Sequence, residues 1–202
     1  LPKFEYHKNT QTDKSQDTLR AGLIYDMPLY ANNPLSHCVE ASIDYKNDRK
    51  QVGQGAAASL SYTPTYAPLH LGYTGTGSFP FMITPWLSVQ AEQADGLEKH
   101  DSSGTVTRFR PSVELALYPL DDYFKKNLEI IFLYEHWINF SRSGPYRDYA
   151  SNQDLFTASL NIYFDRHQHC GVGIDYSTGE NPEEGLGRQT MIAVALKMRI
   201  GK

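Results

Sequence analysis

Strict alternation of apolar and polar side chains is the feature that most constrains how this chain can fold. Near the end of the sequence, residues 189–200 (QTMIAVALKMRI) place Leu196 and Ile200 on one parity and Lys197 and Arg199 on the other. A period of two residues is that of a β-strand, whose successive side chains point to opposite faces. The segment therefore predicts a strand with one oily face and one charged face.

The same alternation recurs along the whole chain, whereas helical periodicity is nearly absent. Turn-rich stretches separate the alternating segments, and many segments exceed the usual strand length of about five or six residues. We expect about ten strands, within a range of roughly 8 to 12. The predicted strands are 3–7, 18–26, 38–45, 55–62, 81–93, 108–118, 126–140, 154–164, 170–176 and 189–200.

The sequence leaves two interpretations of these faces open. In a soluble antiparallel sandwich or barrel, the apolar face packs into a core and the polar face meets water. In a transmembrane barrel, the apolar face meets lipid and the polar face fills the interior. We favour the second: an all-β domain over residues 1–202 that folds as an antiparallel up-and-down transmembrane β-barrel.

The composition of the polar face supports this interpretation. Many of its side chains are small, as a crowded interior requires: Gly22, Ser42, Ser88, Ser112, Ser159, Gly171, Gly173, Ala193 and Ala195. It also carries both signs of charge, which can pair inside a lumen where an isolated ion would be costly. The residues expected to line the interior are Arg20, Glu40, Asp44, Glu92, Arg108, Arg110, Glu114, Glu129, Glu135, Asp175, Lys197 and Arg199.

The connections between strands supply a second test, because membrane barrels alternate long outer loops with short inner turns. The predicted outer loops are 8–17, 46–54, 94–104, 141–153 and 177–189, and the short inner turns are 119–126 and 165–168. The connection 63–80 is too long for an inner turn and predicts an extra strand at 68–73. Aromatic residues near strand ends are expected to form interfacial girdles: Tyr45, Tyr62, Tyr118, Phe140, Tyr163 and Tyr176.

In general pattern, nearly the whole chain resembles bacterial outer-membrane β-barrels as a class, without the motif of a particular family. The resemblance implies the outer membrane of a Gram-negative bacterium as location and outer-membrane lipid as a partner. Such barrels commonly end on an aromatic residue, whereas this sequence ends Ile200-Gly201-Lys202. We therefore expect that the native sequence continues beyond Lys202 or that its end has been altered.

The composition argues against several other classes of protein. A charged fraction of 21% with a net charge of −4 gives no basic surface for nucleic acid. No stretch approaches the roughly 20 apolar residues of a transmembrane helix. The first residues, LPKFEYHKN, contain no signal-peptide core, so any export signal is expected to be removed or to lie outside this sequence. We expect Cys38 and Cys170 to be free thiols.

The interior charges favour a transport or export barrel for a small solute or an exported polymer, without a cofactor. Arg108, Arg110 and Glu114 on one predicted strand and Glu129 and Glu135 on the next are expected to form an interior ladder. A barrel of about eight strands is just filled by its own side chains. The ladder can therefore plug the interior or line a narrow conduit, and the oligomeric state stays open.

An alternative function is hydrolysis of outer-leaflet lipid. His136 lies on the apolar parity near the outer rim, with Ser141 and Ser143 just beyond it. Outer-membrane phospholipases and lipid A deacylases, which this stretch resembles in part, place a His-x-Ser-Asn arrangement on that rim. In this sequence Ile138 stands at the serine position of that arrangement. The candidate catalytic residues are therefore His136 with Ser141 or Ser143.

A third function is recognition by an outer loop. Loop 141–153 carries Arg142, Tyr146, Arg147 and Tyr149, and arginine and tyrosine concentrate binding energy at interfaces. A structural, receptor or adhesion barrel would use these residues to bind a partner. The run His167-Gln168-His169-Cys170 resembles a metal site in composition, but no second ligand pair is spaced to match, so we expect no metal site there.

Overall fold

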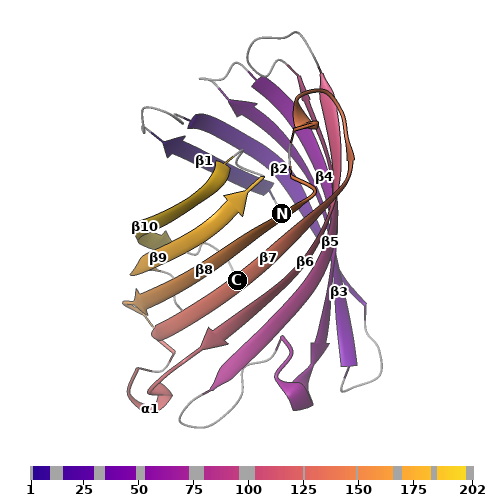
Figure 1. Cartoon of the computed structure of the whole chain (residues 1–202). Helices are drawn as coiled ribbons and strands as arrows, with labels where there is room; N and C mark the ends of the chain where they lie inside the picture. Colours follow the sequence, from indigo (N-terminus) through magenta and orange to yellow (C-terminus); the bar gives the residue numbers. More distant parts are fainter. Residues whose placement is uncertain are drawn as a thin grey trace.

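A computed structural model of the chain describes residues 2–9, 16–29, 35–48, 53–72, 80–95, 103–124, 126–148, 150–165, 170–182 and 186–198. These residues form one large β-sheet with three short helical turns (Figure 1). The strands are β1 (Pro2–Asn9), β2 (Gln16–Leu29), β3 (Leu35–Asp48), β4 (Gly53–Tyr66), β5 (Phe81–Asp95), β6 (Gly104–Leu117), β7 (Leu128–Arg142), β8 (Asn152–Tyr163), β9 (Cys170–Asn181) and β10 (Leu186–Met198). The helical turns are η1 (Ala67–Leu69), α1 (Asp121–Phe124) and η2 (Gly144–Tyr146).

Each strand pairs antiparallel with its neighbours in sequence, so the sheet order runs from β1 to β10 without a crossover. The predicted all-β, antiparallel up-and-down fold is therefore confirmed, and the strand number matches the expected ten. The sheet curls strongly on itself (Figure 1). Within the described residues β1 and β10 are its two edges and do not pair with each other, so closure into a barrel stays a prediction.

The helical turns mark the two ends of the curled sheet. α1 connects β6 to β7 and η2 connects β7 to β8, so they lie at opposite ends of the strands (Figure 1). We call these the α1 end and the η2 end. The predicted outer loop 141–153 and the predicted loop 177–189 both lie at the η2 end.

The predicted extra strand at 68–73 is wrong over the residues described there. β4 continues to Tyr66 and is followed by η1, which contains Pro68. His70 then adopts a left-handed backbone with φ of 56°, and Leu71 makes only isolated bridges to Tyr66 and Ile83. Proline fixes φ and has no N–H to donate, so the chain turns at this point instead of adding a strand.

The predicted loop 177–189 is too long. β9 continues to Asn181 and β10 begins at Leu186, so both strands extend into it. The Thr178 and Thr190 hydroxyls lie 3.0 Å apart across this extension. The alternation of apolar and polar residues did not predict this extension of the two strands, because both faces of the extension are polar.

The two faces of the sheet have inverted polarity. The face we call inner buries polar and charged side chains, including Ser42, Asp44, Ser88, Gln90, Arg108, Ser112, Glu129, Asn139 and Asn161. The face we call outer exposes large apolar side chains, including Leu23, Ile43, Leu60, Val89, Ile162, Ile174, Ile192, Val194 and Leu196. In a soluble antiparallel sheet the apolar face is the packed one. Here the side chains of the apolar face are exposed.

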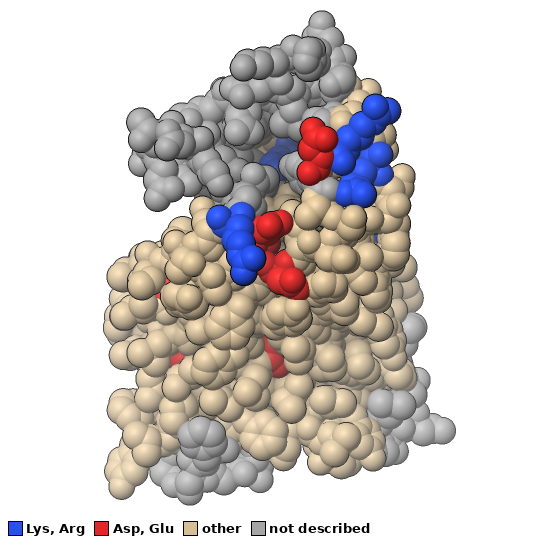
Figure 2. Space-filling view, viewed as in Figure 1, with Lys and Arg blue, Asp and Glu red and all other residues tan. Residues whose placement is uncertain are grey.

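Figure 2 shows that much of the visible surface lacks charged side chains, which gather toward one end of it. No helix in the described part of the chain is long and apolar enough to cross a membrane. Both cysteine thiols, Cys38 and Cys170, are free.

Candidate functional site

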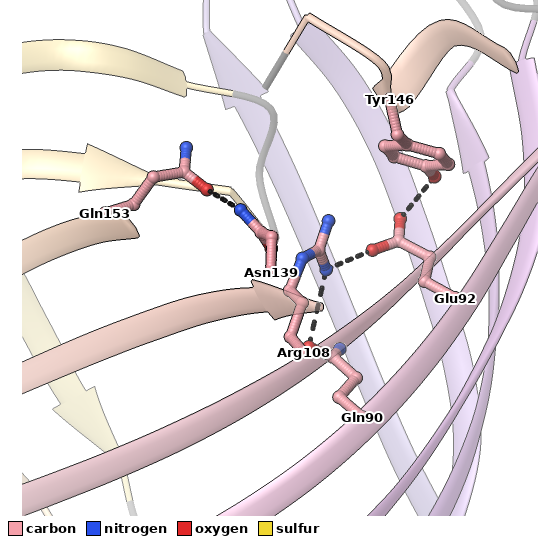
Figure 3. Close-up of polar contacts among 6 residues, drawn as sticks. All are labelled: Gln90, Glu92, Arg108, Asn139, Tyr146 and Gln153. Carbon is pink, nitrogen blue, oxygen red and sulfur yellow. Dashed lines mark hydrogen bonds and ion pairs between the residues drawn. The ribbon is translucent and has the colours of Figure 1, made fainter. Parts of the chain in front are cut away.

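The most deeply buried charge of the inner face is Arg108 of β6, whose side chain is 0% exposed. Its Nη1 forms an ion pair of 2.5 Å with Oε2 of Glu92 on β5 and donates a longer hydrogen bond of 3.4 Å to Gln90 Oε1 (Figure 3). The antiparallel register places Gln90 directly opposite Arg108, so the pairing of β5 with β6 sets these contacts. A buried charge is tolerated only when it is paired and hydrogen-bonded, as Arg108 is here.

Tyr146 covers this ion pair from the η2 end. It belongs to η2, it is buried, and its hydroxyl donates a 3.0 Å hydrogen bond to Glu92 Oε1 (Figure 3). The Arg108 guanidinium lies 5.8 Å from the centroid of the Tyr146 ring, within the range of a cation–π contact. Gly144 begins η2 with φ of 55°, and an added Cβ would overlap the backbone of Ser103 and Gly104. The turn therefore needs glycine to fold inward.

The polar network continues across β7 and β8. Asn139 lies opposite Arg108 and its amide donates hydrogen bonds to Gln153 Oε1 at 3.0 Å and to the Ala150 carbonyl at 2.6 Å (Figure 3). Nε and Nη2 of Arg108 and the indole N–H of Trp137 are buried without a hydrogen-bond partner among the described residues. The inner face at this level thus leaves N–H donors without acceptors, and the Asn139 Oδ1 acceptor is likewise buried without a partner among the described residues.

A second buried cluster surrounds Glu129 near the α1 end. Its carboxylate accepts hydrogen bonds from Tyr118 Oη at 3.1 Å, Tyr163 Oη at 2.9 Å and Asn161 Nδ2 at 3.1 Å. Tyr118 and Tyr163 are buried, so their predicted place in an exposed aromatic girdle is wrong. Three donors compensate the desolvated carboxylate, which explains why both phenols turn inward.

We expect Tyr163→Phe to lower the free energy of unfolding by about 1.5–3 kcal/mol, because it removes a hydrogen bond to a buried charged group. Tyr45→Phe is the matched control, since the Tyr45 hydroxyl donates to Gln54 at an exposed site and should cost less than about 0.5 kcal/mol. Urea-induced unfolding of the folded protein measures both. Equal stability of the two variants would contradict the structural role of the Glu129 cluster.

Two further ion pairs cross the inner face. Arg110 Nη1 lies 3.5 Å from Glu135 Oε1, and Lys197 Nζ lies 2.7 Å from Asp175 Oδ2. The predicted interior ladder is therefore formed only in part. Arg110 does contact Glu135, whereas Arg108 pairs with Glu92.

The other predicted interior residues take varied positions. Asp44 is buried, and Glu40 and Glu114 are half-buried on the inner parity of their strands. The side chain of Arg20 and the whole of Arg199 lie outside the described residues.

Small residues make room for these charges. A Cβ added at Gly173 of β9 would overlap Asn161 Oδ1 and the Lys197 side chain. The side chains of β8 and β10 therefore meet over a glycine, and the interior is crowded at this level.

On the outer face, His136 does not meet either candidate serine. Its Nδ1 lies 2.6 Å from Oδ1 of Asp154 on β8. Ser141 and Ser143 lie five and seven residues further along β7 and its extension, about 15 Å or more at strand spacing. Ser143 Oγ instead accepts a 2.9 Å hydrogen bond from the backbone N–H of Thr105. The structure thus gives His136 an orienting carboxylate, but neither candidate serine lies within reach of it.

The burial of Tyr146 reduces the number of residues that the predicted binding loop 141–153 can present to a partner. That residue lies inside the network with Glu92, so it is not presented to a partner. Arg147 is exposed and Arg142 is half-buried, whereas Tyr149 lies outside the described residues.

The run His167-Gln168-His169-Cys170, at which we expect no metal site, is not tested by the structure. His167 and His169 lie outside the described residues. In the part of the chain that the structure describes, no group of three or more His, Cys, Asp or Glu side chains is placed to hold a metal ion.

Sequence reasoning missed the neutral members of the interior network, which are Gln90, Tyr118, Asn139, Tyr146, Gln153, Asn161 and Tyr163. Their signal was present, because those within strands fall on the same parity as the charges. Tyr146 gave no such signal, since it lies in a turn where parity has no meaning.

In comparisons with protein-family models, with curated proteins and with solved structures, no match to this chain was found.

Proposed function

We propose that this protein is an integral outer-membrane β-barrel that transports or exports a small solute or polymer through a narrow, charge-lined interior. The observation that carries the proposal is the inverted polarity of the sheet. Charged side chains such as Arg108 and Glu129 are buried, while apolar ones such as Val194 are exposed.

The energetics of the outer face support a lipid environment. Burying one large apolar side chain is worth about 1.5–3 kcal/mol, and the outer face leaves many of them largely exposed. Contiguous apolar patches beyond a few hundred Å² are rare on soluble monomers. Strands of 12–15 residues, as β2–β10 are, reach about 40–50 Å and at a tilt near 45° cover a hydrocarbon layer about 30 Å thick.

The interior supports passage of a polar species. Its charges pair across neighbouring strands, so their field is largely neutralised and a polar species would meet hydrogen-bonding groups of both kinds. Tyr146 lies over the Arg108–Glu92 pair at the η2 end. In this proposal Tyr146 is a side chain that narrows the path at the η2 end.

We expect Tyr146→Ala to increase single-channel conductance at least twofold over the wild-type protein in planar bilayers, because it removes a buried ring from the path. Tyr123→Ala is the control, since Tyr123 lies in α1 and is 83% exposed. Absence of conductance in the wild type, in Tyr146→Ala and in Arg108→Ala with Glu135→Ala would overturn the transport proposal. A freely soluble protein that needs no detergent would overturn the membrane location as well.

A further inference from the structure

A pocket of about 230 Å³ lies on the outer face at the η2 end. Strands β7, β8, β9 and β10 all contribute to its lining, which includes Tyr134, Asp154, Phe156, Thr178, Glu180 and Arg188. The lining therefore combines aromatic rings, hydroxyl groups, two carboxylates and one guanidinium. A sugar ring presents hydroxyl groups at its edge and C–H bonds on its faces, so this mixture of polar and aromatic side chains suits a sugar.

The charges of this pocket are not paired with each other. Tyr134 Oη donates to Oδ1 of Asp154 at 2.5 Å, and the contact of His136 Nδ1 is to the same oxygen, so neither uses Oδ2. Arg188 attracts Asp154 electrostatically, yet no ion pair within 4.0 Å joins Arg188 to Asp154 or Glu180 among the described residues. The guanidinium and both carboxylates can therefore still bind groups of a ligand.

The depth of the pocket in the proposed membrane follows from strand geometry. Arg188 precedes Val194 by six residues in β10, which is about 20 Å along the strand. At a tilt near 45° this is about 14 Å of depth, or about half of a hydrocarbon layer that is about 30 Å thick. With Val194 near the middle of the span, the pocket lies at the boundary of the hydrocarbon on the side of the predicted outer loops. It therefore meets the headgroups of the outer leaflet.

The surroundings of the pocket are apolar on the side toward the middle of the strands. Ile192 pairs with Tyr176 and Val194 with Ile174, and all four side chains are exposed on the outer face. A lipid with its headgroup in the pocket would have its acyl chains along this surface. In the outer leaflet of a Gram-negative outer membrane, which is the location proposed above, the lipid headgroups are phosphorylated sugars.

We propose that this pocket binds the phosphorylated sugar headgroup of a glycolipid of the lipid A type, with a phosphate at Arg188 and sugar hydroxyl groups at Asp154 and Glu180. The inference rests on the membrane location proposed above, and it does not depend on transport. A guanidinium binds a phosphate through paired N–H donors. Ionised carboxylates only accept hydrogen bonds, so they fit the O–H donors of a sugar. Because carboxylates repel a phosphate, they also fix which end of the sugar faces Arg188.

Native mass spectrometry of the full chain in maltoside micelles tests this, because it counts lipid molecules that stay bound. We expect one retained lipid A at concentrations where phosphatidylethanolamine and phosphatidylglycerol, which have no sugar ring, bind at least about tenfold more weakly. Arg188→Gln should weaken the binding of lipid A about tenfold, as expected for the loss of a charge-assisted contact, and that of dephosphorylated lipid A by less than about twofold. Glu180→Ala should weaken the binding of both forms about tenfold, because both carry the sugar hydroxyl groups.

Arg147→Gln is the matched control, because Arg147 is an exposed arginine near the same end of the sheet and does not line the pocket. Equal retention of the three lipids, an unchanged affinity in both pocket variants, or an equal effect of Arg188→Gln on the two forms of lipid A would overturn the proposal. Competition by free glucosamine phosphate as strong as by lipid A would assign the site to a soluble ligand and overturn the lipid assignment. The outcome is independent of conductance, so failure here and failure of the transport proposal are distinguishable.

Discussion

Arg108→Ala is expected to lower the free energy of unfolding by about 3–5 kcal/mol, because it leaves the Glu92 carboxylate in a buried site without its counter-ion. The Arg108 side chain is 0% exposed and Glu92 only 10%, so water cannot replace the lost partner well. The hydrogen bond from Tyr146 to Glu92 remains, but one phenol does not neutralise a carboxylate. Urea-induced unfolding of the folded protein in micelles or vesicles measures the difference.

Arg110→Ala is the matched control for this experiment. Its ion pair with Glu135 is longer, at 3.5 Å, and its side chain is 20% exposed, so we expect a loss of about 1 kcal/mol. Arg108→Met combined with Glu92→Met should recover much of the lost stability, since replacing both ions removes the unpaired charge. If Arg108→Ala and Arg110→Ala cost the same, the Arg108 network has no special structural role.

Val194→Arg is expected to cost about 2–4 kcal/mol when unfolding is measured from lipid vesicles, because it places a charge against hydrocarbon near the middle of a span. Val194 lies within β10 opposite Ile174 and is 78% exposed. At an equally exposed site of a soluble protein, the same substitution would change stability by less than about 0.5 kcal/mol. The size of the effect therefore reports which solvent meets the outer face.

Tyr123→Arg is the control for Val194→Arg. Tyr123 is exposed in α1, beyond the ends of the strands, so an arginine there should cost no more than about 1 kcal/mol. Wild-type stability of Val194→Arg in vesicles would contradict the membrane location. It would leave the fold itself unaffected, because the strand pairing does not depend on the side chain at this position.

Together the two experiments separate the inner face from the outer face. The Arg108 experiment probes whether the charges are paired in a desolvated interior, and the Val194 experiment probes the solvent of the opposite face. A soluble protein with an unusual polar core would show the first effect without the second. A membrane barrel shows both.

The fold could be predicted from the sequence because strand parity is a local property. Alternation along segments such as 108–118 fixes which side chains share a face, whatever the rest of the chain does. Antiparallel neighbours follow from short connections, so the meander of ten strands also needed only local information. Errors arose where the local signal failed, as at η1 and at the extension of β9.

The partners within the candidate site could not be predicted, because they depend on register and on the curvature of the sheet. Parity places Arg108 on the inner face, but only the pairing of β5 with β6 brings Glu92 to it in place of Glu135. The inward fold of Tyr146 needs the left-handed turn at Gly144, which no periodicity encodes. The sequence by itself therefore determined the strands and their two faces, since these depend on neighbours along the chain. The tertiary structure decided which charges pair and that Tyr146 covers one of these pairs, since those contacts join residues far apart in sequence.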